Sequence, residues 1–126
     1  MGRELADSAK NYERLHGGNI RYGTGPGQMV CNQFVLACIR ETYGSFPDTV
    51  ADDFENSPRF MKVSQPAAGD LVHWSGHIGI VTDPDHGIFW GSQTSTGVSE
   101  ARYKGASYWN GSYGGREPDY FLRWVG

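Results

Sequence analysis

The 126-residue sequence has few cysteines, no long apolar run and no excess of charge of either sign. Its formal net charge of -3 gives no electrostatic reason to expect nucleic acid or an anionic membrane as a partner. No apolar run approaches the roughly 18 residues of a membrane-spanning helix, so no membrane segment is expected. The opening residues MGRELADSAK contain no apolar signal-peptide core, which predicts synthesis in the cytoplasm without a classical leader.

Only two cysteines are present, Cys31 and Cys38, too few for a disulfide scaffold. If both lie on one helix, their Cα atoms are roughly 10.5 Å apart. A disulfide tolerates at most about 7 Å between Cα atoms. Both residues are therefore expected to be free thiols, as suits a reducing compartment.

Glycine and aromatic residues are abundant, with 18 glycines and 13% aromatic residues, which is typical of a folded domain rich in turns. Apolar spacing predicts a helix over residues 4–15 and a central helix over residues 30–43. The segment PDTVADDFEN predicts a short third helix. NIRYGTGPGQM is expected to be a glycine-rich loop and SPRFMKV a connection.

From Gly69 onward, short runs rich in Val, Ile and aromatic residues predict β-strands. These runs are GDLVHW, HIGIVT, GIFWGSQ, GVSEARY and DYFLRWV, and DPDHG is expected to form the turn of a hairpin. KGASYWNGSYGGREP is expected to be a long loop, of which residues 105–117 line a substrate cleft. Helices followed by an antiparallel sheet predict an α+β fold in a single domain, residues 1–126.

Cys31 lies where the central helix is expected to begin. The free N–H groups and the dipole at a helix start lower the pKa of a thiol and favour the nucleophilic thiolate. Cys38 lies two turns further in on the apolar face and is expected to be buried core. Cys31 is therefore the candidate nucleophile, and its own N–H is the candidate donor to an oxyanion.

His77 begins the HIGIV strand after a turn of small residues, which suits a general base. If the DPDHG turn is centred on Asp85, Gln93 lies opposite His77; a centre half a residue earlier places Ser92 there. Gln93 is preferred as the group that orients the imidazole, because its carbonyl oxygen reaches further and accepts a hydrogen bond. A polar strand without a role in catalysis remains the alternative for this segment.

No metal is expected. Cys31, Cys38, His73 and His77 together offer four potential ligands, but zinc sites usually contain closely spaced Cys or His pairs, and this spacing does not fit.

The order of these pieces resembles the NlpC-type cell-wall peptidases and the related CHAP amidases, which are papain-like cysteine hydrolases. The resemblance lies in NIRYG, VCNQFV, PAAGDLVHW and HIGIV, and it runs from about residue 5 to residue 103. Val30 and Asn32 flank the cysteine where Asp and Ser are usual, which bears on the substrate more than on the reaction. Permuted relatives that transfer acyl groups on lipids have the histidine first, so the order here favours an amide hydrolase.

The resemblance implies a papain-like fold, with the nucleophile helix packed on an antiparallel sheet, and cleavage of an amide bond in bacterial peptidoglycan peptide. Cys31 would attack, His77 would transfer the proton, and Gln93 or Ser92 would orient His77. Tyr22, the aromatic residue of NIRYG, would shape the oxyanion site or the substrate cleft, or serve only in packing. No cofactor is implied.

The lack of a leader and of a wall-binding module, together with the segment FWGSQTSTG, is similar to the small amidase effectors that type VI secretion systems inject into rival bacteria. Such a toxin would act in the periplasm of the target cell and have a cognate immunity protein. A phage or housekeeping wall hydrolase domain is an alternative. Another is a catalytically inactive wall-binding module, in which Cys31 and His77 would be incidental.

Overall fold

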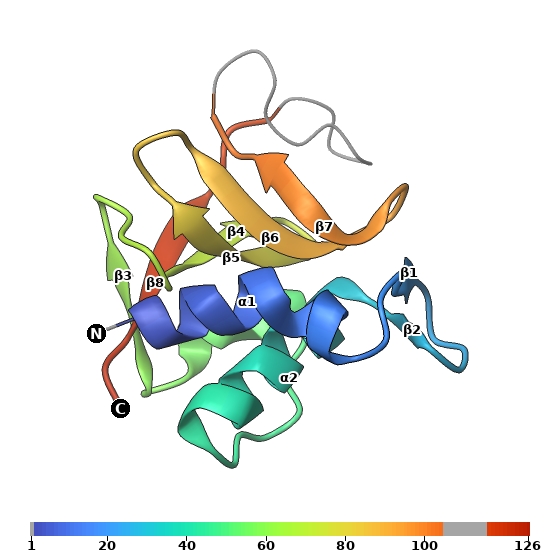
Figure 1. Ribbon diagram of the computed structural model, residues 1–126. Helices are drawn as coiled ribbons and strands as arrows, with labels where there is room; N and C mark the ends of the chain where they lie inside the picture. Colours follow the sequence, from blue (N-terminus) through green and yellow to red (C-terminus); the bar gives the residue numbers. More distant parts are fainter. Residues whose placement is uncertain (1, 105–115) are drawn as a thin grey trace.

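The computed structural model describes residues 2–104 and 116–126. Helices α1 (Arg3–Leu15) and α2 (Cys31–Tyr43) precede the 3-10 helix η1 (Ala51–Asn56). The main sheet has the strand order β3-β8-β4-β5-β6-β7, with every neighbouring pair antiparallel. Its strands are β3 (Phe60–Val63), β4 (Leu71–Trp74), β5 (His77–Asp83), β6 (Ile88–Gln93), β7 (Gly97–Arg102) and β8 (Tyr120–Trp124). Figure 1 shows α1 and α2 together on one side of this sheet.

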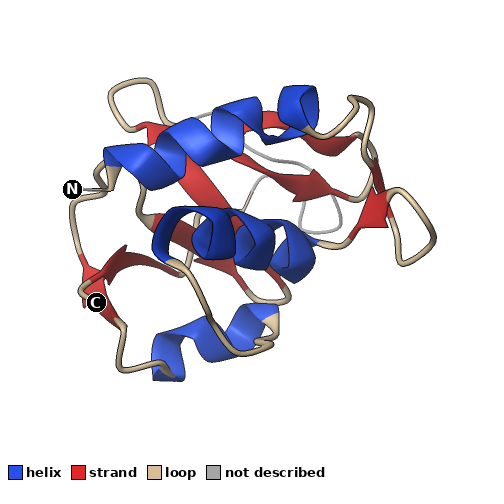
Figure 2. Ribbon diagram, turned by 60° about the horizontal axis from the view of Figure 1, so that its bottom comes forward, coloured by secondary structure: helices blue, strands red, loops and turns tan. Residues whose placement is uncertain are grey.

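The two long helices agree with the sequence predictions to within one residue at each end. Helix α1 buries Leu5, Ala9 and Tyr12, the apolar positions that recur at helical spacing. Helix α2 begins at Cys31 and ends before Gly44. Figure 2 shows the two helices lying side by side over the strands.

The sheet buries side chains on both of its faces. One face packs against α1 and α2 in a cluster that includes Leu71, Ile78 and Ile80. The opposite face contains a second cluster, formed by Val72, Trp74, Val81, Phe89 and Tyr103. Because all of β4 and the first five residues of β5 are buried, these strands read in the sequence as continuous apolar runs.

The hairpin of β5 and β6 has the predicted register. Ile80 pairs with Trp90 and Val81 with Phe89, and a β-bulge between Val81 and Asp83 then shifts the pairing by one residue. The turn therefore does not disturb the pairing toward the other end of the hairpin, where the predicted site residues lie.

Two segments predicted to lack strands contain them. SPRFMKV includes β3, an edge strand paired with β8. In β3 only Phe60 is fully buried, so the apolar alternation that signals a strand is missing. The glycine-rich loop contains β1 (Arg21–Tyr22) and β2 (Gln28–Met29), a parallel pair only two residues long. Within the described ranges, no helix has both the length and the apolar character needed to cross a bilayer.

Candidate active site

Cys31 is the first residue of α2, as predicted. The preceding Val30 has no side-chain oxygen with which to cap the helix, but the Gln33 side chain accepts a hydrogen bond of 2.9 Å from the Val30 N–H. The Cys31 thiol donates to the carbonyl of Gly76, with a sulfur–oxygen distance of 3.8 Å. The helix start is thereby held against the turn that leads into β5.

The pKa of Cys31 is the result of opposing effects. Burial is the largest and raises the pKa above its ordinary value. Main-chain N–H groups of Ile78, Asn32 and Cys31 itself lower it, and the negative charge of Asp52 raises it further. The expected effect of the helix start is therefore present but is outweighed by burial, a correction to the prediction of a lowered pKa.

His77 begins β5 directly after Gly76, whose φ of 81° belongs to the left-handed region that glycine adopts without strain. Its Nε2 lies 2.8 Å from Oε1 of Gln93. The Gln93 amide nitrogen donates to the Ser99 carbonyl at 3.3 Å, which fixes the amide orientation. Oε1 is thus the atom facing the imidazole. Since it can only accept, the proton of the neutral ring lies on Nε2 and the lone pair on Nδ1.

The imidazole is enclosed by aromatic rings, with centroid distances of 5.8 Å to Trp74 and 6.2 Å to Phe89. Burial lowers the pKa of His77 to about 4, the hydrogen bond to Gln93 opposes this shift, and the charge of His73 adds to it. His77 is therefore neutral near pH 7.

The strand pairing beside His77 depends on Gly79, the glycine of HIGIV. A Cβ at this position would lie 2.5 Å from Cδ2 of Phe89 and 2.9 Å from the Trp90 carbonyl oxygen. Real Cβ atoms do not approach other atoms this closely. Glycine thus permits the close contact with β6 that brings Gln93 to the imidazole.

Ser92, the alternative partner for His77, has a different contact. Its hydroxyl donates a 2.6 Å hydrogen bond to the carbonyl of Met29, two residues before Cys31. Adjacent residues of a strand point to opposite faces. Strand β6 therefore contacts the imidazole through Gln93 and the segment before α2 through Ser92.

Tyr22 lies on β1 and is half-buried. It pairs with Met29 of β2, the strand that leads directly into Val30 and Cys31. The structure thus brings Tyr22 near the start of α2. Most of the predicted cleft segment, residues 105–115, lies outside the described residues.

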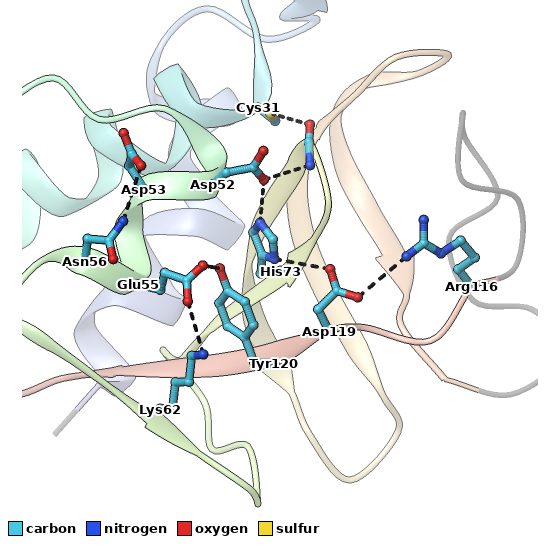
Figure 3. Close-up of polar contacts among 11 residues, drawn as sticks. Cys31, Asp52, Asp53, Glu55, Asn56, Lys62, His73, Arg116, Asp119 and Tyr120 are labelled. Carbon is cyan, nitrogen blue, oxygen red and sulfur yellow. Dashed lines mark hydrogen bonds and ion pairs between the residues drawn. The ribbon is translucent and has the colours of Figure 1, made fainter.

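The structure also contains a polar cluster beside the site that the sequence did not reveal (Figure 3). Nε2 of His73 donates to Oδ1 of Asp52 at 2.7 Å, and Nδ1 of His73 lies 3.6 Å from Oδ2 of Asp119. The His73 ring stacks on Tyr120 with a centroid distance of 4.4 Å. Asp52 comes from η1, His73 from β4, and Asp119 and Tyr120 from the junction at which β8 begins, and no local spacing connects them in the sequence.

In the parts of the chain that the structure describes, no three His, Cys, Asp or Glu side chains are grouped so as to hold a metal ion.

No protein-family model and no curated protein matches the sequence. Among solved structures, the chain is similar to the NlpC/p60 domain of the peptidoglycan hydrolase SagA. The TM-score is 0.67 at 20% sequence identity, over 98% of this chain and 98% of that chain. This chain has the papain-like NlpC/p60 fold. The predicted fold class is thereby confirmed, including the α+β arrangement with the helix of Cys31 on an antiparallel sheet. At this identity the likeness establishes the NlpC/p60 fold alone, and the chemistry has to be argued from the site.

Proposed function

We propose that this protein is a cysteine hydrolase that cleaves an amide bond in bacterial cell-wall peptide. Cys31 is the nucleophile, His77 transfers the proton, and Gln93 orients the imidazole. The observation that carries the proposal is the bond between His77 and Gln93, in a site where the Cys31 sulfur contacts the residues on both sides of His77. The NlpC/p60 fold, shared with a domain of a peptidoglycan hydrolase, supports the substrate class.

The resting site holds a neutral thiol and a neutral imidazole, because burial raises the pKa of Cys31 and lowers that of His77. In the proposed reaction, Nδ1 of His77 takes the thiol proton as sulfur attacks the carbonyl carbon. N–H groups at the start of α2, that of Cys31 included, stabilise the oxyanion. The carbon–nitrogen bond then breaks, and the leaving amine takes the proton from His77. Water, deprotonated by His77, hydrolyses the thioester and frees the thiol.

Gln93 differs from a carboxylate in this mechanism because it fixes the ring without adding a negative charge. The positive charge of the imidazolium that forms during attack is therefore not balanced by Gln93. Gln93 favours the Nε2–H tautomer, and the basic lone pair on Nδ1 is consequently available for the chemistry.

Digestion of purified peptidoglycan, with the fragments identified by mass, tests the proposal and names the bond that is cut. The native protein is expected to release peptide fragments with new amino and carboxyl ends, and Cys31→Ala is expected to release none. Fragment release by Cys31→Ala at the native rate would refute the thiol mechanism.

A catalytically inactive wall-binding module is the second candidate, and the burial of Cys31 and His77 favours it. Such a module would sediment with insoluble peptidoglycan and release no fragments, and Cys31→Ala would bind as well as the native protein. The digestion and sedimentation measurements together separate the two functions.

We further propose that the activity is that of an antibacterial type VI effector that acts in the periplasm of a target bacterium and is neutralised by an immunity protein. Support comes from the similarity of FWGSQTSTG to segments of such effectors. Expression with a periplasmic signal is then expected to lyse bacteria, whereas cytoplasmic expression is tolerated. Cys31→Ala with the same signal is the control. Survival of cells that export the native enzyme would favour a phage or housekeeping wall hydrolase instead.

A further inference from the structure

Asp52 of η1 contacts the turn between β4 and β5 directly. Its Oδ1 accepts a hydrogen bond of 2.8 Å from the Gly76 N–H and one of 2.7 Å from Nε2 of His73. These two contacts lower the pKa of Asp52, that of Gly76 being the larger, so the side chain is a carboxylate at neutral pH. One oxygen atom thus connects η1, β4 and the turn.

Gly76 connects this carboxylate to both members of the proposed catalytic pair. Its N–H binds Asp52, its carbonyl oxygen accepts the Cys31 thiol, and His77 follows it in the chain. The carboxylate and the thiol thus bind the N–H and the carbonyl oxygen of one residue, and Figure 3 shows Asp52 and Cys31 close to each other. A displacement of Gly76 would therefore change the positions of Cys31 and His77 relative to each other.

Asp52 is itself held in place, although 58% of its side chain is exposed. The partner His73 is only 5% exposed and stacks on Tyr120, and its second ring nitrogen lies near Asp119. A buried ring that donates to an exposed carboxylate restricts the carboxylate far more than a solvent contact does.

A second hydrogen bond joins the segment before η1 to the start of α2. The Asn32 side chain donates to the Thr49 carbonyl at 2.9 Å. Asn32 follows Cys31, and Thr49 lies just ahead of η1. Helix α2 and η1 are therefore connected twice, through this hydrogen bond and through their shared contacts with Gly76.

We propose that Asp52 is a positioning residue for the Cys31–His77 pair, which it serves by fixing the Gly76 turn with His73 as its anchor. This proposal rests on the proposed function of Cys31 as nucleophile. Asp52 takes no part in proton transfer, because its contacts are with Gly76 and His73.

The test compares Asp52→Ala, Asp52→Asn and the control Asp53→Ala. An asparagine oxygen still accepts from the Gly76 N–H, whereas alanine cannot. Asp53 is the next residue of η1, and its carboxylate contacts Asn56 instead. Hydrolysis of a purified peptidoglycan fragment gives kcat and KM for each variant, and labelling with iodoacetamide across pH gives the reactivity of each thiol.

Asp52→Ala is expected to lower kcat by tenfold to a hundredfold, on the order of the loss that small misplacements of catalytic groups cause, with little change in KM. Asp52→Asn is expected to recover most of that loss, and Asp53→Ala to match the native enzyme. Equal losses in Asp52→Ala and Asp52→Asn, or no loss in either, would overturn the proposal.

Thiol labelling tests the Gly76 contact without relying on turnover, because Asp52→Asn and Asp52→Ala both lose the charge but only Asp52→Ala loses the acceptor. The midpoint pH for labelling Cys31 is expected to fall in Asp52→Asn, because a negative charge that opposes the thiolate is removed, while His73, His77 and Asp119 remain. Cys38 is expected to stay unlabelled, which shows that the fold is intact. Identical Cys31 labelling profiles in Asp52→Ala and Asp52→Asn would overturn the positioning role alone, whereas unimpaired hydrolysis by Cys31→Ala would overturn the proposed function.

Discussion

The two thiols of α2 lie on one helix and are both buried, yet their surroundings differ. Cys38 is fully buried, and burial raises its pKa to about 12. Cys31 is 6% exposed, and the main-chain N–H groups of three residues act on its sulfur. Its thiol also donates to Gly76, the residue before His77. Inside a helix the N–H groups are used by the helix itself, whereas the first turn leaves them available. Position along the helix, more than burial, therefore distinguishes a candidate nucleophile from a core residue.

Exchanging each thiol for alanine gives the strongest contrast. Cys31→Ala is expected to lower the rate of wall hydrolysis by at least about 10³-fold, since no thioester can form. Cys38→Ala is expected to retain nearly the native rate. Fragment release measured by mass on the same peptidoglycan checks both variants, and comparable rates would remove the functional distinction between the thiols.

Alkylation measures the same contrast in the native protein. Cys31 is expected to be labelled in the folded protein, faster as the pH rises toward its raised pKa, and to be protected by bound wall fragments. Cys38 is expected to react only on unfolding, because the reagent reaches it only when the core opens. Mass spectrometry of the labelled peptides after timed quenching follows both residues at once. Equal labelling rates in the folded protein would contradict the difference described above.

Substitutions of His77 and of its partner Gln93 should affect the reaction at Cys31 and leave Cys38 unlabelled. His77→Ala is expected to be nearly as damaging to turnover as loss of Cys31, because both the base and the proton donor are lost. Gln93→Ala is expected to cost about tenfold, since only the orientation of the ring is lost. Steady-state kinetics rank the two variants. A larger loss in Gln93→Ala than in His77→Ala would contradict the assigned roles.

Between pH 4 and pH 6.5 the stability of the fold should depend on pH through His77, because both thiols stay protonated throughout this range. The native pKa of about 4 lies below the ordinary 6.5, so the unfolded chain binds a proton first as the pH falls. The free energy of unfolding is therefore expected to decrease by about 3 kcal/mol between pH 6.5 and pH 4. Urea unfolding across this range measures the slope, and His77→Gln should flatten it. An equal slope in that variant would mean that another group is responsible.

The smallest expected effect is the loss of stability on replacing Cys38, the thiol in the core. Cys38→Ala removes one buried sulfur atom and is expected to lower the free energy of unfolding by about 1 kcal/mol. Urea denaturation of the variant and of the native protein at pH 7 provides the value. A loss several times larger would mean that Cys38 also supports a contact beyond its volume.

The sequence predicted those features that depend on local patterns. The helical spacing located α1 and α2, and the DPDHG turn predicted the pairing of Ile80 with Trp90. The same register led to Gln93, which the structure places at hydrogen-bond distance from His77.

The remaining features depend on tertiary packing. Edge strand β3 buries a single residue fully and so has no periodic signal. The contact between Asp52 and His73 joins residues of separate elements and has no signature in either segment. The pKa of Cys31 was predicted from the helix start alone, but its direction depends on how much of the thiol the folded chain encloses.

The alternation of Gln93 and Ser92 along β6 also bears on how the site tolerates thermal motion. One residue holds the imidazole, and its neighbour holds the chain just ahead of the nucleophile. When β6 is displaced as a unit, both attached groups follow it in the same direction. Such a motion would therefore change the spacing between sulfur and imidazole less than the position of either one, so the geometry that the proposed reaction needs does not require a rigid sheet.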